Sequence, residues 1–564
     1  MRVLSTSTLD DVQSGREISC CYCVERAAND PKSLAEHLKT LIISKGPLTI
    51  AEFMKLSLTH PTLGFYHNCD VIGKEQSHFI TSPEINQVFG ELLGIWCVTQ
   101  WEQFGKPKKM QLVELGPGRG TLMQDLLRAA RHFPGFFNGL DIHLVEMSPG
   151  MRAKQRYALD CKPLEHEEKP DPVTGMEHMK LRDPSDNDVF WHNTIASVPH
   201  QYPTLILGHE FLDALPIQKF QYTKKGWREI LVDLKEHVDW VEDDAAPAPE
   251  PTPSRDPTFK EILCPHNNLA ATAMLGGLFE GETVEPASSA AESAFLEHVK
   301  RRKQLLEEAA KSSAGLVDGS GKPVVASKLV DGNGKPVVSK LVDASGKPVT
   351  SKRVDESGKP VSNLVDVNGE PIEKLHITED IDRAAGRSKH AMRSASAAME
   401  NVYDAKEGDT IEVCPEASML MQDIIMWLEE TKGSALFIDY GNNYAAKNSL
   451  RGIRNHRFVS YLEDPGKVDI TADVDFHTLR KVVENSKSDL VHYHGPIPQG
   501  YFLCGLGIEE RVRQMAETVE DDSKVDDIIK SAERLVNKDQ MGEVYKVCCI
   551  TTGGQPTGFE GEEQ

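Results

Sequence analysis

Residues 112–122 read LVELGPGRGTL, and this stretch decides the fold class. The apolar run before Gly116 predicts a buried strand, and the apolar positions of TLMQDLLRAAR (121–131) predict the helix that follows it. Between strand and helix, Gly116, Gly118 and Gly120 form a turn without Cβ atoms, so a ligand can approach the backbone closely. The free N–H groups at the start of the helix favour an anionic group such as a carboxylate.

The spacing of the three glycines indicates which cofactor this turn binds. A dinucleotide fingerprint requires G-x-G-x-x-G, whereas this chain has G-x-G-x-G, with Glu114 two residues before the first glycine and Thr121 directly after the last. This form is typical of methyltransferases, and it predicts S-adenosyl-L-methionine as the cofactor, bound by Glu114, the glycines and Thr121. The alternative is a strand-to-helix turn that only needs small residues.

A second acid supports the cofactor interpretation. Glu146 ends the next predicted strand, DIHLVE (141–146), about 26 residues after Gly120. In a doubly wound sheet, an acid at this place lies beside the glycine turn and accepts hydrogen bonds from the ribose hydroxyls. We therefore expect Glu146 to bind the cofactor ribose. A solvated carboxylate at a strand end is the alternative.

The fold class follows from the segments around this motif. Short apolar strands alternate with helical segments: QLVEL (111–115), DIHLVE (141–146) and TLILGHE (204–210) are strand-like, and LFIDYG (436–441) follows the helix-like SMLMQDIIMWLEE (418–430). This alternation predicts an α/β fold with a parallel sheet and helices on both faces.

Two helices are expected before the glycine motif. SLAEHLKTLIISK (33–45) has apolar residues at helical spacing, and Gly46-Pro47 ends it. A second helix is predicted to start with Ser82 as N-cap and Pro83 at the first helical position, and to continue past Trp96 with Gly90 and Gly94 one turn apart on its apolar face. Together these segments predict a helical region before the sheet.

A long polar region interrupts the predicted sheet. Residues 244–257 are rich in proline, and residues 316–374 repeat a short unit, such as LVDGNGKPVVSK, every 11 to 13 residues. Each unit has too few apolar residues to bury a core, so we expect an exposed, mobile insertion. Its Gly-x-Gly-Lys is followed by Pro instead of Ser or Thr, which excludes a phosphate loop, and one carboxylate per unit is too little for calcium.

These patterns divide the chain into five parts. We expect a tail that can hold a targeting signal (1–32), the helical cap (33–107), the first part of the catalytic core (108–235), the insertion (236–407), and the second part of the core with the C-terminal region (408–564).

Composition excludes several classes of function. The chain has 564 residues and a formal net charge of −23, which argues against nucleic acid as a partner. No apolar run is long enough to span a membrane. The 11 cysteines show no disulfide framework, and the closely spaced Cys20, Cys21 and Cys23 lack a second ligand pair for zinc, so no metal site is expected.

A further acidic motif, GHEFLDALP (208–216), follows the third predicted strand. Glu210 is expected to project into the crevice at the carboxyl edge of the sheet, where ligands bind in such folds, and Asp213 follows one turn later. Alternatively, Asp213 caps a short helix and Glu210 pairs with a basic residue at the surface.

Long stretches of the chain resemble a known family. They are, in order, FMKLSLTHPTLGFY (53–66), FITSPEINQVFGELLGIW (79–96), VELGPGRGTL (113–122), HEFLDALP (209–216), GWREILVDL (226–234), LFIDYG (436–441) and DITADVDF (469–476). They are similar to the mitochondrial complex I assembly factor 7 (MidA-like) family of protein arginine methyltransferases. The match runs from about residue 33 to 235 and from about 408 to 550.

The resemblance implies a Rossmann-like, seven-stranded methyltransferase fold with an N-terminal helical cap. It also implies a location in the mitochondrial matrix and symmetric dimethylation of an arginine in a core subunit of complex I (the 49 kDa type) during assembly. The chain departs from the family in its repeat-bearing insertion and in its N-terminus, where Asp10, Asp11 and Glu17 are unlike a transit peptide.

The resemblance also assigns roles to residues. Gly116, Gly118 and Gly120 would hold the methionine part of the cofactor and Glu146 its ribose. Ser82, Glu84 and the Gly90/Gly94 face would close over it, with plain core packing as the alternative for Glu84 and Gly90. His209, Glu210 and Asp213 would act in catalysis, and Asp439 and Tyr440 would line the substrate side, although Asp439 can equally be a helix cap or part of a structural ion pair.

A guanidinium keeps its proton at neutral pH, so the main task of such an enzyme is to position the target nitrogen. A carboxylate such as Glu210 can accept two guanidinium N–H groups side by side. Two other functions stay open on the sequence alone: a non-catalytic complex I assembly chaperone with a vestigial cofactor site, and an NAD-dependent oxidoreductase. The glycine spacing disfavours the oxidoreductase, and the intact glycines, Glu146 and Glu210 argue against a vestigial site.

Overall fold

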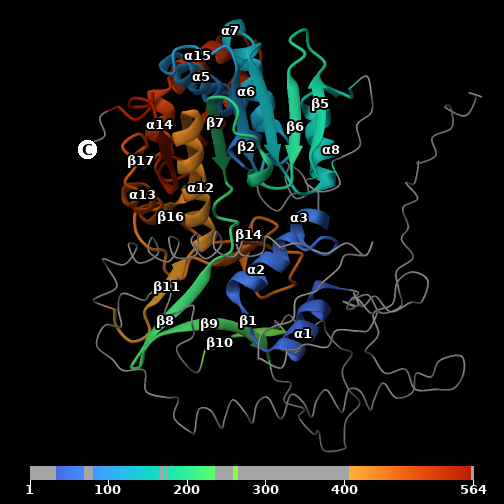
Figure 1. The fold of residues 1–564 in the computed structure, drawn as a ribbon, viewed down its shortest axis with the longest axis vertical. Helices are drawn as coiled ribbons and strands as arrows, with labels where there is room; N and C mark the ends of the chain where they lie inside the picture. Colours follow the sequence, from blue (N-terminus) through green and yellow to red (C-terminus); the bar gives the residue numbers. More distant parts are fainter. Residues whose placement is uncertain are drawn as a thin grey trace, which may run out of the picture.

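The protein has two lobes, an upper one around a large sheet and a lower one around a small antiparallel sheet (Figure 1). The structure, a computed structural model, describes residues 33–68, 81–164, 171, 175–235, 258–264 and 405–560. The predicted tail with Cys20, Cys21 and Cys23, and most of the predicted insertion, including the repeats at 316–374, lie outside the described residues.

The upper lobe is built on a ten-stranded sheet of order β17-β18-β12-β7-β2-β3-β6-β5-β4, with β16 beside β12. Its centre is parallel and consists of β2 (Met110–Leu115), β3 (Leu140–Val145), β6 (Asp188–His192), β7 (Thr204–His209) and β12 (Gly433–Asn442). The strand β18 (Tyr545–Thr551) runs antiparallel between β12 and β17 (His492–Pro498). The seven strands from β6 to β17 confirm the predicted methyltransferase-like α/β fold.

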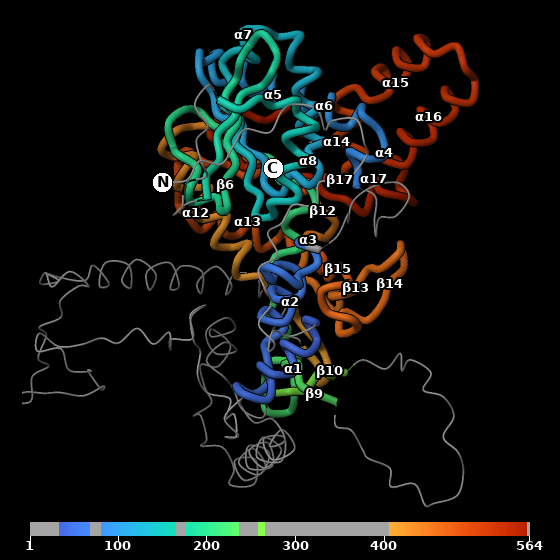
Figure 2. Tube along the Cα trace, turned by 90° about the vertical axis from the view of Figure 1, so that its right-hand side faces the viewer, coloured from blue at the N-terminus to red at the C-terminus, as the bar shows by residue number. Residues whose placement is uncertain are grey.

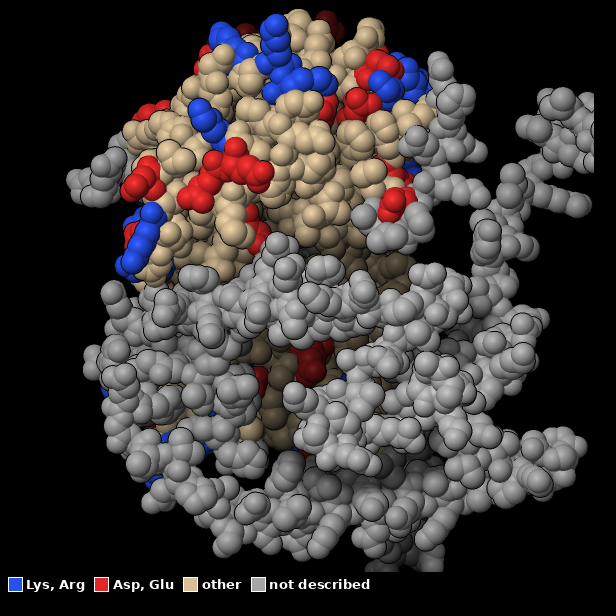
Figure 3. Space-filling view, in the orientation of Figure 1, with Lys and Arg blue, Asp and Glu red and all other residues tan. Residues whose placement is uncertain are grey.

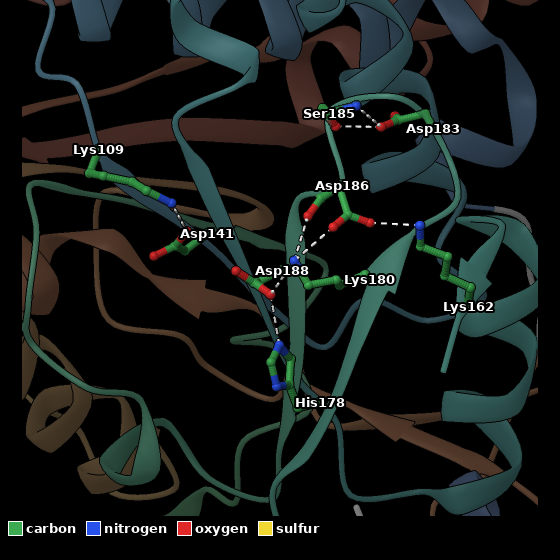
Figure 4. Close-up of polar contacts among 9 residues, drawn as sticks. All are labelled: Lys109, Asp141, Lys162, His178, Lys180, Asp183, Ser185, Asp186 and Asp188. Atoms are coloured by element: carbon green, nitrogen blue, oxygen red, sulfur yellow. Dashed lines mark hydrogen bonds and ion pairs between the residues drawn. The ribbon is translucent and has the colours of Figure 1, made fainter. Parts of the chain in front are cut away.

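Short strands extend this sheet at one edge. They are β5 (Glu177–Leu181) and β4 (Cys161–Lys162), while β16 (Val474–Asp475) pairs with the end of β12. Figure 4 shows the charged side chains around this edge: Lys180 binds Asp186 at 2.9 Å, Lys162 binds the same carboxylate at 2.6 Å, and His178 contacts Asp188 at 2.8 Å. Charged side chains on an edge hinder pairing with another chain.

Helices cover both faces of the large sheet and form two hydrophobic cores with it. The core on one face includes α5 (Gln87–Gln103) and α6 (Thr121–Ala130), and the core on the other includes α12 (Pro415–Thr431) and α13 (Phe476–Asn485). The remaining helices of the upper lobe are α4 (Ser82–Ile85), α7 (Pro134–Phe137), α8 (Pro149–Ala158), η1 (Ile195–Ser197), α14 (Gln499–Gly505), α15 (Ile508–Glu517), α16 (Asp522–Val536) and α17 (Met541–Val544). Figure 2 shows α15 and α16 as an arm that projects from this lobe.

The lower lobe combines segments that are far apart in the sequence. Its antiparallel sheet contains β1 (Leu48–Thr49), β8 (Gln218–Thr223), β9 (Gly226–Leu234), β10 (Phe259–Leu263) and β11 (Thr410–Val413). The helices α1 (Leu34–Lys45), α2 (Ile50–Thr59) and α3 (Phe65–Asn68) lie with it, and a three-stranded sheet is formed by β13 (Arg451–Arg454), β14 (Arg457–Val459) and β15 (Asp469–Thr471). A third hydrophobic core joins α1, α2, β9 and β15. The expected cap, residues 33–107, is therefore shared between the lobes.

The second predicted helix is broken, which corrects the expectation of one helix from Ser82 past Trp96. Thr81, and not Ser82, is the N-cap of the short α4. Asn86 then adopts an extended conformation (φ −152°, ψ 129°), and its side chain accepts the backbone N–H of Val88 at 2.9 Å. Because Asn caps helices well, this residue ends α4 and starts α5 in a new direction.

Gly90 and Gly94 serve the packing of α5 on α6. A Cβ at Gly90 would lie 2.6 Å from the Cβ of Asp125, and a Cβ at Gly94 would lie 2.6 Å from the carbonyl oxygen of Leu126. This geometry favours the core-packing alternative over the expectation that this face closes over the cofactor. Glycines at both positions allow the two helices to approach closely.

A buried hydrogen-bonded chain crosses β2, β3 and β6. The Gln111 Oε1 accepts two backbone N–H groups of the loop before β7, so its amide N–H donates to His143 Nε2 at 3.0 Å. The His143 Nδ1–H then donates to His192 Nε2 at 3.0 Å, and the His192 Nδ1 lies 3.2 Å from Ser197 Oγ. Every member is satisfied only while both imidazoles are neutral.

This chain makes stability sensitive to acid. Burial lowers the pKa of His143 to about 3 and that of His192 to about 4, from 6.5. Below pH 6.5 these histidines are protonated in the unfolded chain but still neutral in the folded one. The free energy of unfolding therefore decreases as pH falls from about 6.5 towards 4. We expect urea unfolding midpoints to be lower at pH 5 than at pH 7. The variant His192→Gln, which keeps one acceptor and one donor, should show a smaller difference, and an unchanged difference would contradict the assignment.

Among the described residues, no helix is long and apolar enough to cross a membrane.

Candidate functional site

The glycine turn between β2 and α6 has a backbone that other residues adopt only with strain. Gly116, Gly118 and Gly120 have φ values of 64°, 52° and 86°. A Cβ at Gly116 would lie 3.0 Å from the ring of Phe211, which follows Glu210. A side chain at these positions would therefore strain the turn, and at Gly116 it would also crowd the segment that carries Glu210.

Glu146 lies beside this turn, where the sequence places it. Its Oε1 accepts the backbone N–H of Ser148 at 2.7 Å, and its Oε2 accepts Gln155 Nε2 at 3.2 Å. The same Gln155 nitrogen donates to the carbonyl oxygen of Gly118 at 2.7 Å. Burial raises the pKa of Glu146, while these hydrogen bonds favour its charged form. The carboxylate is thus held next to the turn with further acceptor capacity.

The predicted residues of α4 also reach the turn. Glu84 Oε1 accepts the hydroxyl of Thr121, the first residue of α6, at 2.6 Å. Ser82 is fully buried, and its backbone hydrogen-bonds to the carboxylate of Glu210. The short helix α4 therefore contacts both the glycine turn and the acid that follows β7.

Two buried polar atoms near the turn suit a bound cofactor. Glu114 Oε2 and Ser82 Oγ have no hydrogen-bond partner among the described residues. Burial raises the pKa of Glu114 to about 8. Buried polar groups are nearly always hydrogen-bonded. A carboxyl and a hydroxyl without partners beside the glycine turn therefore fit a ligand that has both hydrogen-bond donors and acceptors, such as an amino acid moiety. The residues fit S-adenosyl-L-methionine.

Glu210 occupies a strained position directly after β7. Its φ is 48°, a left-handed conformation that is uncommon outside glycine. Its Oε1 accepts the hydroxyl of Tyr545, from β18, at 3.0 Å. Burial raises the pKa of Glu210 to about 8, with a smaller contribution from the charge of Asp213. Strain and a perturbed carboxyl in one residue are typical of a functional site.

Asp439, at the carboxyl end of β12, holds the turn that presents Glu210. Its Oδ2 accepts the backbone N–H groups of Phe211 at 3.1 Å, Leu212 at 2.9 Å and Asp213 at 3.3 Å. This geometry favours the capping alternative for Asp439 over direct contact with a substrate.

Asp213 and Tyr440, which the sequence assigned to catalysis and to the substrate side, are in contact. The Asp213 Oδ2 accepts hydrogen bonds from the hydroxyls of Tyr440 and Thr471, the latter at 2.6 Å. Its Oδ1 is buried without a partner among the described residues. The guanidinium of Arg451 lies 5.0 Å from the centre of the Tyr440 ring, and it binds Asp473 at 2.7 Å.

His209 is a neutral neighbour of Glu210. Burial lowers the pKa of His209 to about 3, so the imidazole is uncharged at neutral pH. Its Nε2 lies 3.6 Å from Glu210 Oε1, too far for a hydrogen bond, and its ring contacts Phe89 edge-to-face at 5.0 Å. A histidine with so low a pKa is a weak base, so its place beside Glu210 suits a wall of the site better than proton transfer.

Several residues of the site come from segments that the sequence did not assign to it. Tyr66 of α3 donates to Asp469 of β15 at 3.2 Å, and burial raises the pKa of Asp469 to about 8. Thr471, Arg451 and Tyr545 also belong here. Both lobes therefore contribute, and Figure 3 shows acidic side chains deep between them where the surface is visible. The quoted stretch DITADVDF contains Asp469 and Thr471, but nothing in its pattern places them against Asp213.

A comparison with known protein families identifies the fold and cofactor. A family model of S-adenosyl-L-methionine-dependent methyltransferases matches residues 92–311 and 348–497. A crystal structure of a COG1565 superfamily member from Burkholderia thailandensis, bound to S-adenosyl-homocysteine, is similar with a TM-score of 0.53. It is 18% identical, and the similarity covers 94% of both chains. At this identity the likeness shows the fold.

Curated relatives are similar over nearly the whole chain. A protein of Xenopus tropicalis is 30% identical over 517 residues, which cover 91% of this chain and 84% of the relative. A Homo sapiens protein is 28% identical over 525 residues, which cover 92% of this chain and 84% of the relative. Both relatives are named "Protein arginine methyltransferase NDUFAF7, mitochondrial".

Proposed function

The chain belongs to the family of S-adenosyl-L-methionine-dependent methyltransferases that includes the NDUFAF7 protein arginine methyltransferases, and we propose that it methylates an arginine side chain of a protein substrate. The observation that carries the proposal is the concentration of buried carboxylates at the carboxyl edge of the sheet. Glu210 and Asp213 lie there with raised pKa values, and Asp469 of β15, whose pKa is also raised, faces Asp213 from the lower lobe. The nearby cation Arg451 is already bound to Asp473.

A guanidinium fits this site by charge and by hydrogen-bonding pattern. It is planar and permanently charged, and it carries several N–H donors that match a carboxylate side by side. Asp213 offers a buried oxygen without a partner, and Glu210 offers a carboxylate held by Tyr545. We propose that these two acids bind the substrate guanidinium, while Tyr66 and Tyr440 form the walls.

The cofactor site is proposed from the residues around the turn. Gly116, Gly118, Gly120 and Glu114 would hold the methionine part of S-adenosyl-L-methionine, Glu146 would hold its ribose, and α4 would cover it. When bound, the cofactor supplies a methyl group on a positively charged sulfur, which makes this carbon an electrophile.

The chain's own residues would position the nucleophile and take up the proton. Glu210 would accept two guanidinium N–H groups, which draws positive charge towards the carboxylate and leaves electron density on the attacking nitrogen. When the new N–C bond forms, that nitrogen loses its proton. Glu210 can accept this proton, since its pKa of about 8 lies close to neutral pH.

We propose symmetric dimethylation in the mitochondrial matrix, on a core subunit of complex I of the 49 kDa type, as in the family that the sequence resembles. The names of the relatives support a mitochondrial location and the methylation of arginine. The test is mass spectrometry of the subunit's arginines in cells with and without this protein, which separates symmetric from asymmetric dimethylarginine. Loss of a symmetric mark supports the proposal, and an unchanged mark refutes the substrate.

The same cells can distinguish the enzyme from an assembly chaperone. Complex I assembly should return with the native chain and fail to return with Glu210→Gln. Full recovery with that variant would show that assembly depends on binding and not on methylation.

A further inference from the structure

One buried side chain links the two halves of the cofactor site. Gln155 lies on α8 with no exposed surface, and its amide contacts three separate elements. Its Nε2 donates to the carbonyl oxygen of Gly118 at 2.7 Å and to Glu146 Oε2 at 3.2 Å, and its Oε1 accepts the indole N–H of Trp191 at 2.9 Å. The glycine turn, the end of β3 and the strand β6 thus meet at one amide.

The orientation of this amide follows from its partners. An indole N–H can only donate, so Trp191 must face the amide oxygen of Gln155. The Gly118 carbonyl and the Glu146 carboxylate can only accept, so both must face the amide nitrogen, whose two hydrogens serve one each. A flipped amide would lose all three hydrogen bonds, and a buried flipped amide would leave these groups unsatisfied.

The backbone of α8 also supports the turn. A Cβ at Gly120 would lie 3.2 Å from the Cα of Gln155 and 3.4 Å from its Cγ. The glycine turn therefore rests directly on the residue that also holds Glu146. A displacement of Gln155 would move both.

We propose that Gln155 is a positioning residue for the cofactor, which sets the conformation of the glycine turn and the direction of the Glu146 carboxylate together. This inference rests on the proposed roles of the turn and of Glu146. Ser148 and Gln155 engage different carboxylate oxygens of Glu146, and the backbone of Met147 also hydrogen-bonds to this carboxylate, which keeps acceptor capacity for a ribose hydroxyl. Trp191 contributes indirectly, because its indole N–H fixes the orientation of the Gln155 amide.

The test is Gln155→Met, which keeps the length of the side chain and removes both donors. We expect the Kd for S-adenosylhomocysteine, measured by calorimetry, to rise at least about tenfold, because the hydrogen bonds to Gly118 and Glu146 are lost and the indole N–H of Trp191 loses its acceptor. At saturating cofactor and peptide, kcat should stay within about threefold, since the residue contacts no reacting group. An unchanged Kd, or a loss confined to kcat, would overturn the inference.

A matched control and a second variant keep the outcome clear. Gln124 of α6 is exposed and donates to the carbonyl oxygen of Ala158 at the end of α8. Gln124→Met removes a similar hydrogen bond, and this variant should bind S-adenosylhomocysteine with the native Kd. If Gln155→Met does not fold, Trp191→Phe carries the test: it leaves the amide in place but frees its orientation, and native affinity would overturn the inference.

Glu146→Ala separates this inference from the proposal beneath it. Native affinity in Glu146→Ala would refute the ribose role of Glu146. Weakened binding in Glu146→Ala together with native binding in Gln155→Met would refute the role of Gln155 alone.

Discussion

Replacing Glu210 with glutamine is expected to lower kcat for arginine methylation at least about 100-fold, because the guanidinium loses the charged group that orients it. The affinity for S-adenosylhomocysteine should stay within about threefold, since the glycine turn and Glu146 are untouched. Glutamine has the same shape and can still accept the hydroxyl of Tyr545, so the fold should be preserved. The measurement is a peptide methylation assay beside calorimetry.

A surface variant tests whether the loss of activity comes from the position of Glu210 or only from the loss of one negative charge. Glu429 is exposed on α12, and Glu429→Gln should methylate at the native rate. Native activity in Glu210→Gln would exclude Glu210 from the reaction. Loss of cofactor affinity in the same variant would instead assign it to the cofactor site.

In the native enzyme, the pH dependence of kcat/KM should reflect the ionisation of Glu210. Burial raises the pKa of Glu210 to about 8, and the ionised form is the one that binds a cation. The kcat/KM at limiting peptide should therefore rise with pH through about 8 and fall at lower pH, because protonation removes the negative charge.

Replacing Gly118 with valine is expected to abolish cofactor binding, with the Kd for S-adenosylhomocysteine raised by about 100-fold or more. Gly118 has a φ of 52°, a conformation that costs an ordinary residue roughly 1–2 kcal/mol and a β-branched one more. The side chain would also stand on the turn that the ligand approaches. The backbone would shift to relieve the strain, and the carbonyl that Gln155 binds would move with it.

Gly105 provides the matched control for strain alone. It has a φ of 80°, and a Cβ there meets no atom within 4 Å. Gly105→Val should therefore lower stability in the same way but keep native cofactor affinity. Equal loss of affinity in both valine variants would show that strain, and not the place of Gly118, explains the result.

Local patterns carried much of the fold prediction. The strands at 111–115, 141–146 and 204–210 and the helix at 121–131 lie where apolar spacing places them, because these segments are buried against one sheet. The sequence did not settle the role of a residue that could either contact a ligand or serve the packing of the fold. Gly90 and Gly94 pack on α6, and Asp439 receives three backbone N–H groups, although the sequence allowed a ligand role for each.

The sequence by itself determined the glycine turn, the βαβ order and the position of Glu210 and Glu146 at strand ends, because all of these depend on residues close together in the chain. Only the tertiary structure decided what surrounds Glu210. Tyr66, Asp469 and Tyr545 come from α3, β15 and β18, all of which are distant from Glu210 in the sequence. No local pattern records such contacts, since burial against a distant segment, and not spacing along the chain, raises the pKa of each acid in the site.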